Sequence, residues 1–239
     1  MLPKDLTQVA WIGDSCLKGR IRGVVVDLHG LNHTAMKTDA GYAELEWGAA
    51  GGLIVFPYCG PWSWMNRGTR RFVNELISAV YRRYKLSKKT PLIITGASMG
   101  GLGALIYTRY TRHPVKACAA VMPVCDLKHH FTERFDLPRT ILEAFRGYPG
   151  TLEKFFKEQS PLHQAAHMPD IPYFLIHGDK DSAVNKKKHS DRLVTALRKH
   201  GRKTEYAEIS GMGHGEHMTY EAHRRKIDFV KKFLTGDAA

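Results

Sequence analysis

The sequence has few cysteines, only four among 239 residues, at Cys16, Cys59, Cys118 and Cys125. Their spacing matches neither a paired metal-binding motif nor a dense disulfide scaffold, and Cys118 lies in an apolar, strand-like run. We therefore expect reduced thiols that are mostly buried.

Long apolar segments, internal repeats and low-complexity linkers are also missing. No stretch approaches the roughly 20 apolar residues that a membrane-spanning helix needs, and the N-terminal residues lack the apolar core of a secretory signal. The length and the 43% hydrophobic content fit one globular domain over residues 1–239. These absences lead us to expect a cytoplasmic protein that does not contact a membrane.

Basic residues outnumber acidic ones and give a formal net charge of +13 at pH 7. Much of this charge lies on two predicted helices, near 186–203 and 224–232, and no nucleic-acid-binding motif accompanies it. A basic face in contact with solvent is the simpler explanation. We therefore expect no nucleic-acid partner, and attraction of an anionic substrate is the lesser alternative.

Short apolar runs alternate with amphipathic stretches along the chain. The runs lie at 24–28, 53–56, 92–95, 117–122, 173–177 and 206–209. Between the second and third runs, apolar residues from 72 to 84 recur at helical spacing, which predicts a crossover helix. This alternation is typical of a mostly parallel sheet flanked by helices.

One connection is far longer than usual, since about 50 residues separate the runs at 117–122 and 173–177. Aromatic and aliphatic residues occur throughout it, which predicts two or three short helices. We expect residues 126–170 to form a helical lid under which an acyl or aromatic group could bind. Packing of the insertion onto the domain is the simpler role for most of these side chains.

The most specific motif is the G-x-S-x-G pentapeptide Gly96-Ala97-Ser98-Met99-Gly100. It follows the apolar run at 92–95 and precedes a stretch of helical periodicity. This order is that of a nucleophile elbow, a strained turn that holds a serine hydroxyl above the sheet and needs glycine where the backbones pass closely. The following helix N-terminus favours an oxyanion. The motif therefore predicts that Ser98 is a nucleophile for acyl transfer.

A serine hydroxyl is a weak nucleophile at neutral pH and needs an imidazole base, which in turn needs a carboxylate to orient it. Candidates follow the last two predicted strands, at the edge of the sheet where active sites lie. The turn after 173–177 contains Asp179 and Asp181, and the glycine-rich loop after 206–209 contains His214. The chain order serine, aspartate, histidine is the one that accompanies a nucleophile elbow.

With these residues in place, the chain resembles the α/β-hydrolase superfamily over nearly its whole length. It is most similar to the serine esterases and to the catalytic domains of prolyl-oligopeptidase-like enzymes. The late turn of the superfamily reads H-G-x-x-D-x-x-V, which this chain matches with His177, Gly178, Asp181 and Val184. The resemblance therefore implies that Asp181 is the acid, with Asp179 as its rival.

The resemblance also implies the base. The last loop of the superfamily ends in G-x-G-H or G-x-x-H, which His214 matches, and His217 three residues further on is the alternative. Asp126, after the run at 117–122, is a third candidate for the acid because some members of the superfamily carry it there. We expect Asp179 to hydrogen-bond to the backbone within its own turn.

An oxyanion hole needs two backbone N–H donors. Met99, directly after the nucleophile, supplies the first. The loop His29-Gly30-Leu31-Asn32 follows the first predicted strand and resembles the H-G-x loop of esterases and acyl thioesterases. This resemblance implies the Leu31 N–H as the second donor, with Asn32 as the alternative and a structural role for His29.

Trp62 and Trp64 follow the run at 53–56 and should lie beside the mouth of the site. They are candidates for stacking on a sugar or an aromatic substrate, and packing under the insertion is the alternative. The histidine pairs of the insertion, at 129–130 and at 163 and 167, have no third ligand at a metal-binding spacing. We expect neither a metal nor a cofactor.

These residues predict a single-domain serine hydrolase, a carboxylesterase that cleaves a small-molecule ester through an acyl-enzyme. Ser98 attacks, and His214 acts first as a base and then as an acid, oriented by Asp181. The amides of Met99 and Leu31 hold the oxyanion.

Other functions stay open. The resemblance suggests a prolyl-oligopeptidase-like peptidase, but such peptidases usually carry an N-terminal propeller, whereas the first clear strand here begins near residue 24, which favours esters. Acyl-thioester hydrolysis uses the same machinery. A non-catalytic binding protein would have kept the fold and lost the chemistry, and the presence of every catalytic residue type speaks against it. The oligomeric state does not follow from the sequence.

Overall fold

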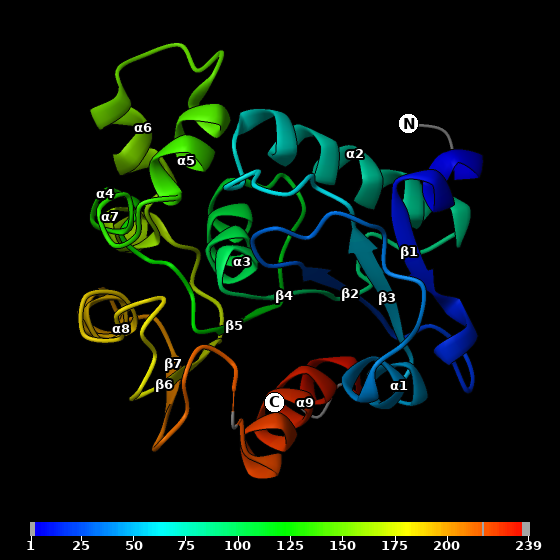
Figure 1. Cartoon of the computed structure of the whole chain (residues 1–239). Coiled ribbons are helices and arrows are strands. Elements are labelled where there is room, and N and C mark those ends of the chain that lie inside the picture. The colour runs from blue at the N-terminus through cyan, green and yellow to red at the C-terminus, as the bar shows by residue number, and fades with distance from the viewer. Residues whose placement is uncertain (1–2, 217, 236–239) are drawn as a thin grey trace.

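Seven strands form one central sheet (Figure 1). They are β1 (Ala10–Gly13), β2 (Gly23–Leu28), β3 (Gly52–Pro57), β4 (Leu92–Ala97), β5 (Ala117–Val121), β6 (Tyr173–Gly178) and β7 (Thr204–Ile209). The order across the sheet is β1-β3-β2-β4-β5-β6-β7, and only the β1–β3 pair is antiparallel within the computed structural model, which describes residues 3–216 and 218–235. The predicted fold class is confirmed.

The six predicted apolar runs all form strands. Every residue of β5 and of β6 is buried, as expected for parallel strands that are covered on both faces. The prediction that the first strand begins near residue 24 is wrong, because β1 precedes it. Four residues are too few to show a period, and β1 is defined by its pairing with β3, with Trp11 opposite Phe56.

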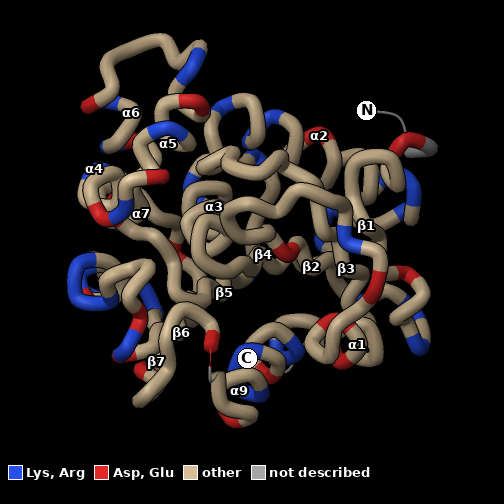
Figure 2. Tube along the Cα trace, viewed as in Figure 1, with Lys and Arg blue, Asp and Glu red and all other residues tan. Residues whose placement is uncertain are grey.

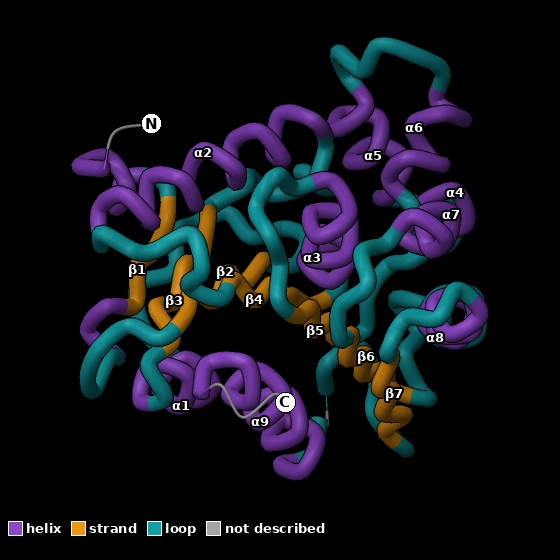
Figure 3. The backbone as a smooth tube through the Cα atoms, turned by 180° about the vertical axis from the view of Figure 1, so that it is seen from behind, coloured by secondary structure: helices purple, strands orange, loops and turns teal. Residues whose placement is uncertain are grey.

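Helices cover both faces of the sheet, as Figure 3 shows from behind. On one face lie α2 (Arg67–Arg83), α3 (Met99–Tyr110) and α8 (Ser190–Lys199), and on the other lie α1 (Tyr42–Ala49) and α9 (Tyr220–Thr235). The predicted crossover helix corresponds to α2, which Asn66 caps by accepting a hydrogen bond from the Thr69 N–H at 3.0 Å. Two 3-10 helices, η1 (Pro3–Gln8) and η2 (Asp14–Cys16), flank β1.

Successive strand residues belong to different cores because side chains alternate along a strand. Val24 and Val26 of β2 pack in the core that includes α2 and α3, while Val25 packs in the core that includes α1 and α9. All three side chains are fully buried. This burial on both faces explains why the strands read as continuous apolar runs.

Parallel strands bring their carboxyl ends to one edge of the sheet. Leu28 at the end of β2 pairs with Gly96 in β4, and Gly178 at the end of β6 pairs with Ile209 at the end of β7. The loops that follow these strands therefore start at similar levels. We call this edge, with its loops, the catalytic edge, because the sequence predicts the catalytic residues in these loops.

The insertion between β5 and β6 contains more helical pieces than the two or three predicted. They are α4 (Leu127–His130), α5 (Leu137–Phe145), α6 (Leu152–Gln159), α7 (Pro161–Gln164) and the 3-10 helix η3 (Ala165–His167). Most of its apolar side chains pack into the domain: Leu137, Ile141 and Phe155 are 0% exposed, whereas Phe135 is 99% exposed. The packing role expected for most of these residues therefore holds.

Lys and Arg residues occur on several helices, including α2, α8 and α9 (Figure 2). The helix predicted over 186–203 is shorter, because α8 begins at Ser190. Lys186 lies before it, and its ammonium is 2.7 Å from the Asp191 carboxylate and 2.5 Å from that of Glu208. This lysine is paired with two acids and does not belong to a basic face in contact with solvent.

Cys16, Cys118 and Cys125 are buried free thiols, and Cys59 is half-buried, as the sequence predicts. Burial raises the pKa of Cys118 to about 12. Across the ranges 3–216 and 218–235, no helix combines the length and the apolar character that a membrane span requires.

Candidate active site

Ser98 lies at a sharp turn between β4 and α3. Its φ of 57° and ψ of −121° are strained for a residue with a Cβ. A Cβ built on Gly100 would overlap the carbonyl oxygens of Leu28 and His29, and one built on Gly96 would overlap the carbonyl of Gly100. Only glycine at both positions lets the strand and the helix approach this closely, and the half-buried serine is left at the catalytic edge.

His214 joins Ser98 to Asp181. Its Nε2 lies 2.9 Å from Ser98 Oγ, and its Nδ1 lies 2.8 Å from Asp181 Oδ2. An ionised carboxylate can only accept, so Nδ1 carries the proton and Nε2 is left to accept the serine hydroxyl proton. The structure thus brings the three predicted residues together from the turns after β4, β6 and β7.

The Asp181 side chain is 0% exposed. Its Oδ1 accepts the N–H groups of Ala183 and Val184, both at 2.9 Å, and its Oδ2 accepts from His214 and from His177 Nε2 at 3.1 Å. Burial by itself raises the pKa of a carboxyl group, but these hydrogen bonds outweigh burial and hold the pKa of Asp181 well below its usual range. The Asp181 carboxylate is therefore ionised at neutral pH, and its negative charge would stabilise an imidazolium on His214.

A second histidine, His177, also hydrogen-bonds to Asp181. The sequence identifies His177 only as part of the H-G-x-x-D-x-x-V motif. Its ring is buried, and its Nε2 lies 3.1 Å from Asp181 Oδ2 and 3.0 Å from the Val184 carbonyl oxygen. Both oxygens can only accept, so Nε2 carries the proton, and Nδ1 accepts from Ser190 Oγ at 2.7 Å. The signal for this contact is the H-G-x-x-D spacing, which places His177 at the end of β6 beside the acid.

The rival residues point elsewhere. Asp179 Oδ1 accepts the Gly211 N–H in the loop after β7 at 2.7 Å, so the expectation that Asp179 bonds within its own turn is wrong. Asp126 caps α4 by accepting the His129 N–H at 3.1 Å. The alternative base His217 lies outside the described residues.

Residues 29–32, which we call the oxyanion loop, pass beside Ser98, because a Cβ built on Gly30 would lie 3.9 Å from Ser98 Cβ. The Asn32 N–H donates to the Pro61 carbonyl at 2.8 Å, whereas the Leu31 N–H has no acceptor in the described part of the chain. Met99 is the first residue of α3, so its N–H has no acceptor within the helix. Of the two alternatives for the second donor, the contacts favour Leu31.

His29 holds this loop in place. Its Nε2 accepts the Cys59 N–H at 3.0 Å, so the proton lies on Nδ1, which donates to the Gly30 carbonyl at 2.9 Å. Burial lowers the pKa of His29 and keeps the ring neutral. These contacts tie the oxyanion loop to the loop after β3, in agreement with a structural role.

Trp64 is 1% exposed. Its indole N–H donates to Thr140 Oγ1 in α5 at 3.1 Å, and its ring packs edge-on against His130. The prediction that Trp64 contacts substrate is therefore wrong, because the side chain is enclosed where the insertion packs on the domain.

Trp62 is half-buried and lines a cavity of about 190 Å³ between the loop after β3 and α5. Pro61 lines the same cavity and accepts the hydrogen bond from Asn32, so the cavity lies next to the oxyanion loop. Trp62 therefore stays a candidate for substrate contact.

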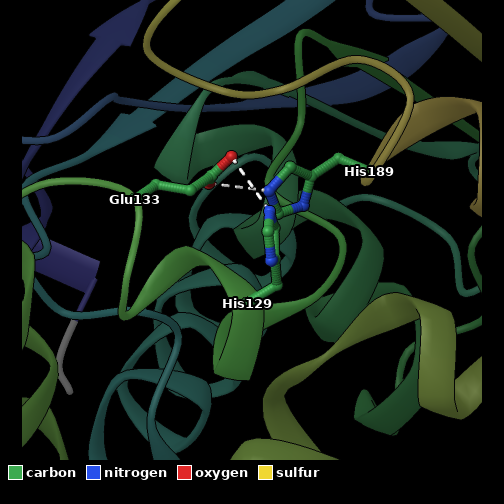
Figure 4. Close-up of side chains that lie close together, drawn as sticks. All are labelled: His129, Glu133 and His189. Carbon is green, nitrogen blue, oxygen red and sulfur yellow. Dashed lines mark hydrogen bonds and ion pairs between the residues drawn. The ribbon is translucent and has the colours of Figure 1, made fainter.

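Three side chains that could hold a metal ion meet near α4 (Figure 4): the ligand atoms of His129, Glu133 and His189 all lie within 4.8 Å of one another. No sequence pattern predicts this cluster, because His189 lies far from His129 and Glu133 in the chain. His189 Nδ1 accepts the backbone N–H groups of Cys125 and Asp126, at 2.9 and 3.1 Å, so its proton is on Nε2 and is donated to Glu133. A metal needs that nitrogen free, so the cluster is a hydrogen-bonded group around Glu133.

Taken together, the catalytic edge has the parts that acyl transfer requires. A hydroxyl is hydrogen-bonded to an imidazole nitrogen that can take its proton, and a buried carboxylate fixes that imidazole. Within the described residues, the backbone N–H groups of Leu31 and Met99 have no backbone acceptor, so they are candidate donors to an oxyanion.

Solved structures with this fold include peptidases and an esterase. A puromycin-hydrolyzing peptidase from Mycobacterium tuberculosis has 20% identity and a TM-score of 0.71, and an acylaminoacyl peptidase from Pyrococcus horikoshii has 18% and 0.74. The matches cover 92% of this chain but only 34% and 38% of those chains. Esterase PE8 has 16% identity and a TM-score of 0.62, with 91% of this chain and 95% of that chain covered. At these identities the similarity shows the fold.

No curated protein matches the sequence. A family model described as the prolyl oligopeptidase family matches residues 73–237, which is more than half of the chain and includes Ser98, Asp181 and His214. The chain therefore belongs to the prolyl oligopeptidase family, among the serine hydrolases with the α/β-hydrolase fold.

Proposed function

We propose that this serine hydrolase cleaves carboxylic esters of small molecules through an acyl-enzyme on Ser98. The observation that carries the proposal is the hydrogen-bonded chain from Ser98 through His214 to the buried Asp181. This chain supplies both the base that activates the hydroxyl and the carboxylate that stabilises the base once it is charged.

In the first half of the reaction, Ser98 Oγ attacks the ester carbonyl carbon while its proton passes to His214 Nε2. The carbonyl oxygen becomes an oxyanion, which the Leu31 and Met99 N–H groups stabilise. The imidazolium then protonates the leaving oxygen, and the alcohol departs. In the second half, His214 takes a proton from water, the hydroxide attacks the acyl-enzyme, and Ser98 leaves with the proton restored.

Two features support esters over peptides. An alcohol oxygen leaves more easily than an amide nitrogen, so ester cleavage depends less on remote binding contacts. The full-length overlap with esterase PE8 is in keeping with this choice.

Trp62 and its cavity are the proposed binding surface for the apolar part of the ester. The indole ring offers a flat apolar wall, and about 190 Å³ is room for a short acyl chain or part of an aromatic ring. We therefore propose short-chain or aromatic esters as the substrate class.

Hydrolysis of p-nitrophenyl butyrate by wild type and by Ser98→Ala tests the mechanism. We expect turnover by the wild type and none above the background rate by the variant. Activity of more than a few per cent in a folded Ser98→Ala protein would show that Ser98 is not the nucleophile.

Peptide hydrolysis is the second candidate, because the family model and several structural neighbours are named after peptidases. A matched pair of substrates decides between them: the p-nitrophenyl ester and the p-nitroanilide of one N-acylated amino acid. Esters are intrinsically more reactive than anilides. We therefore expect the ratio of kcat/KM for the ester to kcat/KM for the anilide to exceed the ratio of their uncatalysed rates. Faster turnover of the anilide would contradict the esterase proposal, and a thioester with the same acyl group tests the thioesterase alternative.

A further inference from the structure

Glu133 lies between α4 and α5, and its carboxylate binds groups from several parts of the chain. Its Oε2 accepts from His130 Nδ1 at 2.5 Å and from His189 Nε2 at 2.9 Å. Its Oε1 accepts the Asn185 N–H at 3.1 Å and lies 3.4 Å from His129 Nε2. The side chain is 13% exposed, so this acceptor is largely shielded from water.

Two of these partners belong to the segment that carries the catalytic acid. Asn185 directly follows Val184, whose N–H donates to Asp181 Oδ1 at 2.9 Å. His189 is the last residue of the same segment, and its N–H donates to the Asn185 carbonyl at 3.0 Å. We call residues 181–189 the acid turn.

The C-terminal end of the acid turn is also hydrogen-bonded to the segment that follows β5. His189 Nδ1 accepts the N–H groups of Cys125 and Asp126, which follow β5. The ring of His189 therefore bridges the end of β5 and Glu133. Without the carboxylate, Asn185 would lose its acceptor and His189 would keep a buried N–H without a partner, which is costly.

The Glu133 carboxylate is ionised at neutral pH. Burial raises the pKa of such a group, but the hydrogen bonds from His130 and His189 outweigh burial and hold the pKa of Glu133 well below its usual range. Hydrogen bonds to an ionised acceptor are stronger than those between neutral groups. The Glu133 carboxylate therefore holds Asn185 and His189 more firmly than a neutral side chain would.

We propose that Glu133 is a positioning residue for the catalytic acid: by holding Asn185 and His189 it fixes the acid turn, so that Asp181 stays aligned with His214. This inference rests on the proposed Ser98–His214–Asp181 mechanism. It also gives the insertion a part in catalysis, because Glu133 belongs to the insertion and acts on a turn of the catalytic edge.

Glu133→Gln and Glu133→Asp test the proposal in the full chain. The first keeps the length of the side chain and removes the charge, and the second keeps the charge and shortens the reach. We expect kcat for p-nitrophenyl butyrate to fall roughly 10-fold in each, because small misalignments of catalytic groups are costly. KM should be unchanged, since Glu133 does not line the Trp62 cavity. A change in KM with unchanged kcat would overturn the proposal.

Glu153→Gln is the matched control. Glu153 also belongs to the insertion and is ion-paired, to Lys128 at 2.8 Å, but its side chain is 50% exposed and does not touch the acid turn. This variant should keep the wild-type kcat. An equal loss of kcat in the control would mean that any lost charge in the insertion has the same effect, which contradicts a specific role of Glu133.

A double-mutant cycle separates positioning from mere loss of structure. In an Asp181→Asn background the acid is already disabled, so Glu133→Gln should lower the residual kcat by less than about 2-fold. The same 10-fold loss in both backgrounds would show that Glu133 does not act through Asp181. Hydrogen exchange in 182–189 should also be faster in Glu133→Gln than in wild type at equal global stability, and unchanged exchange there would contradict the proposal.

Zinc titration tests the competing metal interpretation. We expect no saturable Zn²⁺ binding that Glu133→Gln abolishes, and no loss of activity with EDTA. Tight binding together with EDTA-sensitive activity would overturn the positioning role in favour of a metal centre. If Ser98→Ala stays active, the proposed function itself fails; if Ser98→Ala is inactive and Glu133→Gln is fully active, only this inference fails.

Discussion

The catalytic edge and the insertion are held in place by different forces. At the edge, loops that directly follow strands are fixed by hydrogen bonds, such as the four that Asp181 accepts. In the insertion, apolar side chains such as Ile141 and Phe155 are buried in the domain core. We infer that substitutions at the edge should reduce the rate and spare stability, whereas substitutions in the packed part of the insertion should do the opposite. Glu133 is where the two regions meet.

The largest effect is expected for Asp181→Asn. An amide cannot stabilise the imidazolium and would favour the wrong tautomer of His214, so kcat should fall by about 10³- to 10⁴-fold. Asp179→Asn is the matched control two residues away and should stay within a few-fold of wild type, because the Asp179 carboxylate accepts hydrogen bonds from Gly211 and Ser210 in the loop after β7. Steady-state kinetics on p-nitrophenyl butyrate measures both. A larger loss of kcat in Asp179→Asn than in Asp181→Asn would show that Asp179 is the catalytic acid.

The next effect is expected at the oxyanion loop. Leu31→Pro removes the backbone N–H and should lower kcat by about 10²-fold, the usual loss for one oxyanion donor. Leu31→Ala keeps the N–H and should retain most of the activity. Equal losses in the two variants would mean that the side chain of Leu31 matters and its N–H does not.

Substitutions of the two tryptophans test the expected difference between the insertion, where stability should fall, and the binding site, where KM should rise. Trp64→Ala leaves a cavity in the buried contact with Thr140, so the free energy of unfolding should fall by about 3–5 kcal/mol, with kcat of the folded protein close to wild type. Trp62→Ala should raise KM for aromatic esters several-fold and change stability little. Urea unfolding and steady-state kinetics check both. A Trp64→Ala protein of full stability and low kcat would contradict the division between the regions.

The smallest effect concerns pH. Because the pKa of Asp181 is depressed in the folded state, its stabilising contribution is present above the unfolded value of about 3.9 and is lost as pH falls toward the folded value. The difference in unfolding free energy between wild type and Asp181→Asn should therefore be constant from about pH 7 to 5 and shrink below about pH 4. Ser98→Ala keeps Asp181 and should follow wild type. A difference that grows on acidification would contradict an ionised acid.

The sheet and the predicted triad residues follow from local patterns. Apolar runs mark the buried strands β4 and β6, and Ser98 and Asp181 lie in the short turns directly after them. His214 lies in the loop after β7, which is only partly buried. Since parallel strands end at one edge, the sequence places the three residues together without any knowledge of side-chain contacts. β1 could not be predicted in this way, because four residues are too few to show a periodic pattern of apolar side chains.

The contacts that the sequence did not predict are long-range and depend on packing. Nothing near Glu133 in the chain indicates that His189 and Asn185 will meet it, and the spacing of Trp62 and Trp64 does not show which ring will be buried. The choice between Leu31 and Asn32 as donor also depends on a distant partner, since Pro61 takes the Asn32 N–H. Such facts arise when the insertion and the loops pack on the sheet.

Covalent labelling tests the central claim most directly. A fluorophosphonate reacts with a serine only where a base activates it and an oxyanion hole stabilises the product. We predict one adduct per chain, located by peptide mass spectrometry on Ser98, and none in Ser98→Ala or in heat-unfolded protein. A folded wild-type protein that carries no adduct, or carries it on another residue, would contradict the account.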